Sequence, residues 1–253
     1  MVQGRLYVFC VVAFGFSCAT SALLRALEKV LKNVREFTLN FIDDLSVLSG
    51  TFEEHIQHLD TIFKTLIENN ITLNFSKCKF FKKEVKFLGF ILSEKGLSQD
   101  PDKLKKIREY KRPKNIKQLQ AYLGTINFYS KFSENYAKET YPLYQLLKKD
   151  AKFKWTPELD EAFERTKNLF IQERTLTFPD LEKDYYLIVD SSCHSIAGIL
   201  SQYDDNGIEK IITIVSRTLK GCELAYTVSE WELLSIVFCM RKLYTYLYGA
   251  NVI

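Results

Sequence analysis

Two adjacent aspartates, Asp43 and Asp44, stand between two apolar segments with the composition of β-strands, residues 36–42 and 45–49. A hairpin with this pair as its tight turn would bring both carboxylates together at one tip. Carboxylate oxygens are the hard ligands that Mg²⁺ prefers, and metal-assisted phosphoryl transfer depends on such a site. The same pair is also compatible with an ordinary polar turn, because aspartate favours turns for local reasons.

Helix and strand signals alternate in the first hundred residues. Apolar residues at helical spacing predict a helix over residues 17–34, which would pack on the acidic hairpin. A second helical pattern covers residues 53–68 and ends at the pair of asparagines that follows. A further hairpin is predicted over residues 80–92, with its turn at residues 82–84.

Helix-start signals mark the middle of the chain. Asp100 followed by Pro101 is typical of an N-cap and the first helical position. Asn115 can cap the next helix, and Thr156 followed by Pro157 opens another. This part of the chain is therefore predicted to be mainly helical.

The apolar pattern changes to a period of two in the last third of the chain. It predicts three strands, at residues 185–190, 196–202 and 208–215. Residues 204–207 form a turn between the last two strands, and a long helix is predicted over residues 223–246.

Charge is unevenly distributed along the chain. The formal net charge is +4, yet residues 77–117 contain 14 Lys or Arg against 5 Asp or Glu. A basic stretch interleaved with aromatic residues is typical of a surface that follows a phosphate backbone. Ordinary solvated faces of helices and hairpins would give a similar composition.

Six cysteines are scattered without a Cys-x-x-Cys pair or a cluster with histidine, which argues against a zinc site and for a reducing compartment. At the start of the chain, Arg5 precedes an apolar run over residues 6–16 and small residues over 17–22. This pattern is compatible with a signal peptide, and the run is too short to span a membrane.

A series of different short motifs extends along nearly the whole chain. They are Phe14-Gly15, Glu54-His55, Lys77-Cys78, Phe87-Leu88-Gly89, Leu123-Gly124, Phe128-Tyr129, Phe178-Pro179-Asp180, Asp190-Ser191-Ser192, Ser216-Arg217-Thr218-Leu219 and Glu230-Trp231-Glu232-Leu233. In this series the sequence resembles the reverse transcriptase and ribonuclease H region of gypsy-type long-terminal-repeat retrotransposon Pol polyproteins. Two prolines of the family pattern are replaced, by Ala13 and Thr20.

The resemblance implies a mixed α+β fold, in which a partial right-hand polymerase is followed by an incomplete ribonuclease H-like α/β domain. We expect a reverse transcriptase palm with the acidic hairpin and a second hairpin, the primer grip, over residues 1–93. A thumb-like helical region over residues 94–152 would follow. Residues 153–253 would form the ribonuclease H-like domain, truncated at its C-terminus.

The resemblance also implies roles for particular side chains. The catalytic carboxylates, which would hold Mg²⁺ in two-metal sites, are Asp43, Asp44, Asp190 and Glu232. The expected nucleotide- and template-binding residues are Phe14, Gly15, Lys77, Phe87, Leu88 and Gly89. The implied partners are nucleic acids, namely an RNA template, a DNA primer and the RNA–DNA hybrid, with no role for a membrane.

The family completes each metal site with further carboxylates. Its polymerase site uses a third aspartate from a strand upstream of Phe14-Gly15, and its ribonuclease H site uses two acidic residues that would follow Ile253. Because first-shell ligands place both cations, we expect the isolated chain to be inactive in both reactions.

Three functions are compatible with the sequence. The first is a segment of a retrotransposon polymerase, and the second is a non-catalytic nucleic-acid-binding or interaction protein derived from such an element. The third is a secreted α/β protein, which would require cleavage of the first twenty or so residues. The first two predict a cytoplasmic or nuclear location.

Overall fold

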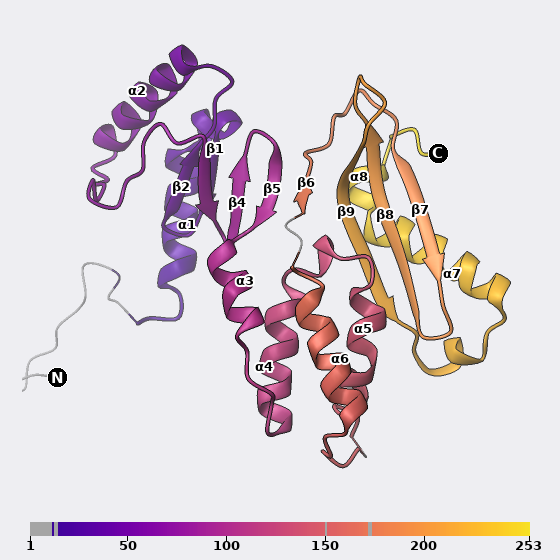
Figure 1. Cartoon of the computed structure of the whole chain (residues 1–253). Coiled ribbons are helices and arrows are strands. Elements are labelled where there is room, and N and C mark those ends of the chain that lie inside the picture. The colour runs from indigo at the N-terminus through magenta and orange to yellow at the C-terminus, as the bar shows by residue number, and fades with distance from the viewer. Residues whose placement is uncertain (1–11, 13–14, 150, 172–173) are drawn as a thin grey trace, which may run out of the picture. The chain divides into compact units, whose positions relative to one another are not determined.

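The structure is a computed structural model that describes residue 12 and residues 15–149, 151–171 and 174–253. The chain divides into two compact units, Met1–Phe80 and Phe81–Ile253. In Figure 1 the first unit runs from indigo to purple and the second from magenta to yellow.

The first unit packs two helices around one small hairpin. Its elements are α1 (Ala19–Val30), the 3-10 helix η1 (Lys32–Phe37), β1 (Thr38–Phe41), β2 (Asp44–Val47) and α2 (Phe52–Glu68). Leu31 and Val34 are buried with Ile62 and Leu66 of α2, and Leu45 and Val47 of β2 pack against them. The helix predicted over 53–68 is confirmed, whereas the one predicted over 17–34 changes to a 3-10 helix after Leu31.

The second unit begins with a three-stranded meander of β3 (Glu84–Phe87), β4 (Phe90–Ser93) and β5 (Gly96–Gln99). The predicted turn at residues 82–84 is wrong, because the chain turns at Leu88 and Gly89 instead. Both residues have positive φ, 49° and 82°, as a two-residue type I′ hairpin turn requires. Phe87 and Phe90 form the closing pair of this turn.

A helical bundle follows the meander. It comprises α3 (Pro101–Arg108), α4 (Ile116–Asn127), the 3-10 helix η2 (Ser130–Phe132), α5 (Tyr136–Gln145) and α6 (Pro157–Asn168). Both predicted caps are confirmed: the Asp100 carboxylate accepts from the N–H of Asp102 at 3.1 Å, and Asn115 accepts from that of Gln118 at 2.9 Å. These bonds satisfy backbone donors that a helix start leaves unpaired.

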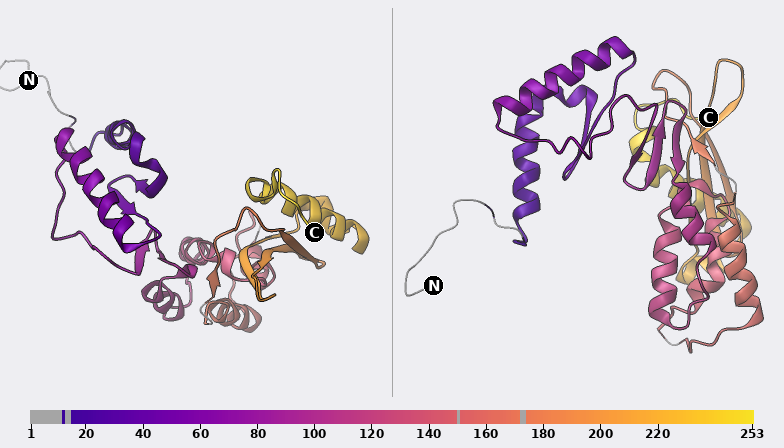
Figure 2. Two further views of the ribbon diagram at one scale, coloured as in Figure 1. Left: turned by 90° about the horizontal axis from the view of Figure 1, so that it is seen from above. Right: turned by 60° about the vertical axis from the view of Figure 1, so that its left-hand side comes forward.

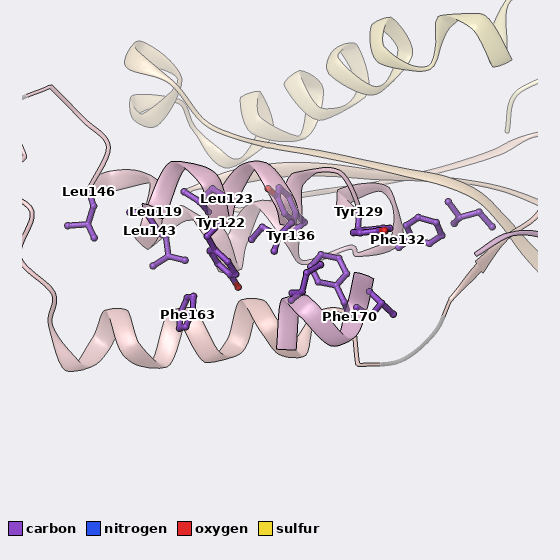
Figure 3. Close-up of a cluster of buried hydrophobic side chains, with 14 residues drawn as sticks. Leu119, Tyr122, Leu123, Tyr129, Phe132, Tyr136, Leu143, Leu146, Phe163 and Phe170 are labelled. Carbon is purple, nitrogen blue, oxygen red and sulfur yellow. The ribbon is translucent and has the colours of Figure 1, made fainter. Parts of the chain in front are cut away.

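Aromatic and aliphatic side chains together fill the core of this bundle, as Figure 3 shows. Tyr122 is completely buried, and its hydroxyl lies 2.7 Å from Thr166 Oγ1. The ring of Tyr122 also packs at a centroid distance of 4.7 Å from Phe163 of α6. Because the hydroxyl is hydrogen-bonded, the large ring is buried without leaving an unpaired polar atom.

The last third of the chain forms an antiparallel sheet in the order β7-β8-β9, with β7 at Tyr186–Ser191, β8 at Ser195–Tyr203 and β9 at Glu209–Thr218. The 3-10 helix η3 (Gly221–Ala225), α7 (Val228–Lys242) and α8 (Tyr244–Leu247) follow. The three predicted strands are confirmed. The single helix predicted over 223–246 is wrong at its start, since Thr227 and Glu230 form a capping box that begins α7 at Val228.

Two helical layers cover the two faces of this sheet, α7 and α8 on one side and α5 on the other (Figure 2). The final residues lie along the free edge of β7: the N–H of Tyr185 donates to Asn251 O at 3.0 Å and that of Leu187 to Ile253 O at 3.0 Å. Tyr185 and Val252 form a parallel bridge. The end of the described chain therefore extends the sheet by a parallel segment.

A short linker strand, β6 (Thr175–Leu176), joins the two sheets of the second unit. It pairs antiparallel with β5, and the N–H of Thr177 donates to Ile211 O of β9 at 2.7 Å. Gly96 makes the first contact possible, because a Cβ at this position would lie 2.1 Å from Leu176 O, and its φ is +125°.

We expect Gly96→Ala to lower the free energy of unfolding by more than about 2 kcal/mol, because it adds both a steric overlap and a disfavoured φ. Gly124→Ala is the matched control, since nothing lies within 4 Å of its position in α4. This control should stabilise the helix by ~0.5–1 kcal/mol. Urea unfolding followed by circular dichroism measures both, and a Gly96→Ala variant as stable as the wild type would contradict the packing described.

Candidate metal and nucleic-acid sites

The acidic hairpin closes one residue earlier than the sequence predicted. Phe41 pairs with Asp44, so the two central turn residues are Ile42 and Asp43, and Asp44 is the first residue of β2. The predicted Asp-Asp turn is therefore wrong in register. The two carboxylates are nevertheless adjacent at the tip, one in the turn and one at the strand start.

Ile42 has a φ of +57°. A β-branched residue in this left-handed region is a steric outlier that costs ~1–2 kcal/mol. Such strain persists only where the surroundings impose it, and it concentrates at functional sites. Here it lies directly beside the two aspartates.

The carboxylates of Asp43 and Asp44 are exposed, and no described residue forms an ion pair or hydrogen bond with them. Leu45 and Val47 face the core of the first unit, so strand alternation turns Asp44 to the opposite, open face. Two adjacent hard oxygen donors without protein partners suit a divalent cation.

Asp190 lies in β7, opposite Ala197 of β8. Leu187 and Val189 pack on the α7 side of the sheet together with Cys239, so alternation places Asp190 on the other face, where it is exposed.

The first turns of α7 carry two glutamates with different surroundings. The Glu230 carboxylate accepts from the N–H of Thr227 at 2.7 Å and from its hydroxyl at 2.9 Å, so this residue caps the helix. Glu232 is exposed and its carboxylate has no partner among the described residues. It lies on the same helix stripe as Cys239, seven residues further along.

A close helix–sheet contact holds α7 in place. A Cβ at Gly198 of β8 would lie 2.3 Å from Cys239 Sγ, so only glycine permits this approach. The elements α7 and β7 are thus packed against each other, with Asp190 on the face of β7 that points away from α7. No group of three or more His, Cys, Asp or Glu side chains in the described ranges is arranged to hold a metal ion.

The turn between β3 and β4 rests on an aromatic cluster. Phe90 stacks on Phe128 at 4.5 Å, and a Cβ at Gly89 would lie 3.2 Å from the Phe128 ring. The Tyr129 hydroxyl donates to Gly89 O at 2.8 Å. Burial raises the pKa of Tyr129 to about 12, so this donor stays protonated at neutral pH.

Lys131 completes the cluster. Its Nζ lies 4.0 Å from the centroid of the Phe90 ring, a cation–π contact, and burial lowers the pKa of this amine. The aromatic cluster packs against one side of the turn, whereas Leu88 at the tip of the turn remains 40% exposed. The contacts of Gly89 and Phe90 with Phe128 and Tyr129 thus hold the turn formed by Phe87, Leu88 and Gly89 in place.

The other predicted nucleotide-binding residues lie apart from this turn in sequence. Phe14 lies outside the described residues, and Gly15 is an exposed turn residue with φ of +89°. Lys77 is exposed in a turn in which its N–H donates to Asn74 O at 3.0 Å.

One polar cluster was not predicted as a structural element from the sequence. The Arg217 guanidinium binds both oxygens of Glu223, at 2.6 and 2.9 Å, and the Trp231 indole donates to Glu223 O at 2.7 Å. The arginine lowers the pKa of the Glu223 carboxyl. This cluster ties the start of α7, and with it Glu232, to the end of β9.

Two family models match the chain. Residues 2–92 match the model of reverse transcriptase (RNA-dependent DNA polymerase), and residues 155–253 match that of the RNase H-like domain found in reverse transcriptase. Proteins of both families are in general dependent on divalent metal ions.

Similar proteins come from transposons of fly and yeast. The chain is 35% identical to the retrovirus-related Pol polyprotein from transposon gypsy of Drosophila melanogaster, over 99% of this chain and 25% of the relative. It is 35% identical to the corresponding polyprotein of transposon 297, over 96% of this chain and 23% of the relative. The Tf2-3 polyprotein of Schizosaccharomyces pombe is 30% identical, over 96% and 18%. The chain thus spans a quarter or less of the length of these relatives.

Solved structures of foamy viral protease-reverse transcriptase share the fold. One, in complex with double-stranded DNA, has a TM-score of 0.83 and 25% identity, covering 94% of this chain and 42% of that one. Another, in complex with RNA/DNA hybrid, has a TM-score of 0.80 and 25% identity, covering 95% and 33%.

The fold and the two family matches define a reverse transcriptase that continues into a ribonuclease H-like domain. More specifically, the chain belongs to the Pol polyproteins of gypsy-type long-terminal-repeat retrotransposons. Among the described residues, no helix is both long and apolar enough to cross a bilayer.

Burial of Cys239 against Gly198 gives a chemical test of the helix–sheet contact. Burial raises the pKa of the Cys239 thiol to about 11, whereas Cys18, Cys193 and Cys222 are exposed. At pH 8 we expect alkylation of Cys239 by iodoacetamide to be more than about a hundredfold slower than that of the exposed thiols. Peptide mass spectrometry measures each rate, and equal rates would contradict the packing of α7 on β8.

Proposed function

We propose that this chain serves RNA-directed DNA synthesis, coupled to degradation of the RNA strand in the resulting hybrid. The observation that carries the proposal is the pair of unpartnered carboxylates, Asp43 and Asp44, at a strained hairpin tip inside the segment that matches reverse transcriptases. Strain beside free carboxylates is expected where a site is organised for a ligand.

The proposed cofactor is Mg²⁺. Asp43 and Asp44 would hold it for polymerisation, and Asp190 and Glu232 for RNA cleavage. A bound divalent ion would stabilise the charge that develops on the transferred phosphoryl group. The donor set fits this ion, because all four groups are exposed carboxylates free of ion pairs within the described ranges.

The proposed partners are an RNA template, a DNA primer and their hybrid. The rigid turn of Phe87, Leu88 and Gly89 would position the primer end, and Phe14, Gly15 and Lys77 would contact template or nucleotide. Support comes from the similar foamy viral structures, which were solved with double-stranded DNA and with RNA/DNA hybrid. The proposed location is therefore the cytoplasm or nucleus.

The basic stretch supplies cations for the phosphate backbone. Some are already engaged: Lys86 binds Asp100 at 3.0 Å and also Asp102, and Arg112 binds Asp160 at 3.3 Å. Others have no carboxylate partner in the described part of the chain, namely Lys103, Lys106, Lys111, Lys114 and Lys117. These free cations are the proposed phosphate contacts.

We propose three functional parts, a palm over residues 1–93, a thumb over 94–152 and a ribonuclease H-like domain over 153–253. We further propose that the 253-residue polypeptide alone binds hybrid without turnover. A non-catalytic nucleic-acid-binding role is the second candidate. Primer extension by the purified chain would exclude that candidate and would also contradict the proposed lack of turnover by the isolated chain.

We expect the purified chain to bind an RNA–DNA hybrid with an affinity that falls steeply as salt rises, with a log–log slope of about −0.9 per phosphate contacted. Lys106→Ala and Lys111→Ala should each reduce the slope by about 1. Lys64→Ala is the control, because Lys64 is paired with Asp60 at 2.6 Å on α2. Fluorescence anisotropy at several salt concentrations measures the slopes, and salt-independent binding would contradict the proposal.

Substitutions of the two glutamates of α7 should have different effects, one on metal binding and the other on stability. Glu232→Gln is expected to weaken Mn²⁺ binding to the second unit and leave stability unchanged, because its carboxylate is free. Glu230→Ala is expected to lower stability by ~0.5–1 kcal/mol and leave Mn²⁺ binding unchanged, because it removes the acceptor of the capping bonds from Thr227. Water proton relaxation and urea unfolding measure the two effects, and the reverse pattern would reassign the ligand to Glu230.

A further inference from the structure

A polar cluster lies at the base of the acidic hairpin, where β2 leads into α2. Ser49 Oγ lies 2.8 Å from His58 Nδ1 and 3.0 Å from His55 Nδ1. We propose that Ser49, His55 and His58 are positioning residues that hold the tip carrying Asp43 and Asp44 in its metal-binding orientation. This inference rests on the proposed metal role of the two aspartates.

The contact between His58 and a backbone carbonyl shows which ring nitrogen of His58 carries a proton. His58 Nδ1 also lies 3.2 Å from Leu48 O, and a carbonyl oxygen can only accept, so Nδ1 of His58 carries the proton. Ser49 Oγ then accepts from His58, and its hydroxyl can in turn donate to Nδ1 of His55. The three side chains therefore form one connected hydrogen-bonded network between the end of β2 and α2.

His58 reaches both strands of the hairpin. Its ring stacks face to face on Phe37, which precedes β1, at a centroid distance of 3.7 Å and an angle of 7°. On the other side it bonds to Leu48 and Ser49, which follow β2. The N–H of Leu48 in turn donates to Phe37 O at 2.9 Å. One imidazole therefore clamps the two strand ends together.

Glu54 secures the rest of the connection. Its carboxylate accepts from the N–H of Gly50 at 2.7 Å and of Thr51 at 3.3 Å. These bonds lower the pKa of the Glu54 carboxyl, and its second oxygen lies 3.8 Å from His58 Nε2. Every residue from Leu48 to Thr51 is thus bonded to the first turns of α2.

The hairpin depends on this base because little else orients it. It has only two strands, and an isolated two-stranded hairpin is marginally stable. Leu45 and Val47 bury one face, whereas Leu39 and Phe41 on the other are 42% and 47% exposed. The described side-chain hydrogen bonds that hold it all lie at the base, including that of Thr38 to Val34 O at 2.8 Å.

Small movements at the base become large at the tip. The tip lies several residues from Phe37, at about 3.4 Å per residue. A small rotation at the base therefore displaces the two carboxylates by a distance that grows with the length of the hairpin. A misplacement of about 1 Å can cost ~100-fold in rate at a catalytic site. The hydrogen bonds at the base are therefore expected to keep the carboxylates in position as well as to stabilise the hairpin.

The test uses NMR on the 253-residue chain with two readouts. Hydrogen exchange of the Leu48 N–H reports whether the base is closed, and Mn²⁺-induced broadening of residues 42–45 reports the tip. His58→Phe keeps the stacking but loses the donor, while His58→Asn keeps a donor equivalent to Nδ1. His194→Phe is the matched control, because His194 stacks on Tyr141 at 4.5 Å in the second unit.

We expect His58→Phe to accelerate Leu48 exchange at least fivefold and to weaken the Mn²⁺ effect at the tip at least fivefold. His58→Asn should restore both to within twofold, and His194→Phe should change neither. Ser49→Ala, a milder change, should shift both readouts in the same direction as His58→Phe if the latter folds poorly.

The outcomes separate the two claims. If the wild type shows no Mn²⁺ effect at the tip, or Asp43→Asn with Asp44→Asn leaves it unchanged, the proposed metal role of the aspartates is wrong. If the wild type shows the effect and both His58→Phe and Ser49→Ala leave exchange and broadening unchanged, the positioning role alone is overturned.

Discussion

The second unit depends on the linker strand β6 to join its two sheets. This strand pairs with β5, and the residue that follows it is hydrogen-bonded to β9. Through it, the meander that carries the Leu88–Gly89 turn and the sheet that carries Asp190 share one hydrogen-bonded framework. Gly96 permits the contact, since any side chain there would overlap Leu176 O. The turn and the ribonuclease H-like sheet therefore keep a fixed spacing within this unit.

The aromatic bundle core reinforces this framework. Tyr129 and Phe132 after α4 and Phe170 after α6 belong to one buried cluster, and the partly buried Phe90 of the meander packs against it. Ile211 of β9 packs against the same cluster from the sheet. The β3–β4 turn and β9 are therefore joined by side-chain packing as well as by hydrogen bonds.

Local signals predicted local structure well. The caps at Asp100 and Asn115 were identified from residue type and position, because a side-chain oxygen directly before a helix can accept from the unpaired N–H groups of its first turn. The turns at Ile42 and Leu88 were missed, because nothing in an isoleucine or a leucine signals a positive φ; the surrounding strands impose it. Tertiary contacts override intrinsic preference at such positions.

The site could be predicted only in part for a related reason. Adjacent aspartates are visible in a sequence, whereas the separation of Glu230 from Glu232 requires the capping bonds from Thr227. The Ser49, His55 and His58 cluster likewise depends on a loop that folds back onto α2, which no periodicity shows. Side-chain hydrogen bonds, rather than propensities, decide which carboxylates remain free for a ligand.

The central claim is that the free carboxylates are ligands for divalent cations. Anomalous diffraction near the manganese edge, from crystals of the chain grown with an RNA–DNA hybrid and Mn²⁺, tests it most directly. We expect one peak within coordination distance of Asp43 and Asp44 and another beside Asp190 or Glu232. Hybrid bound in the crystal with no anomalous peak at either carboxylate pair would contradict it.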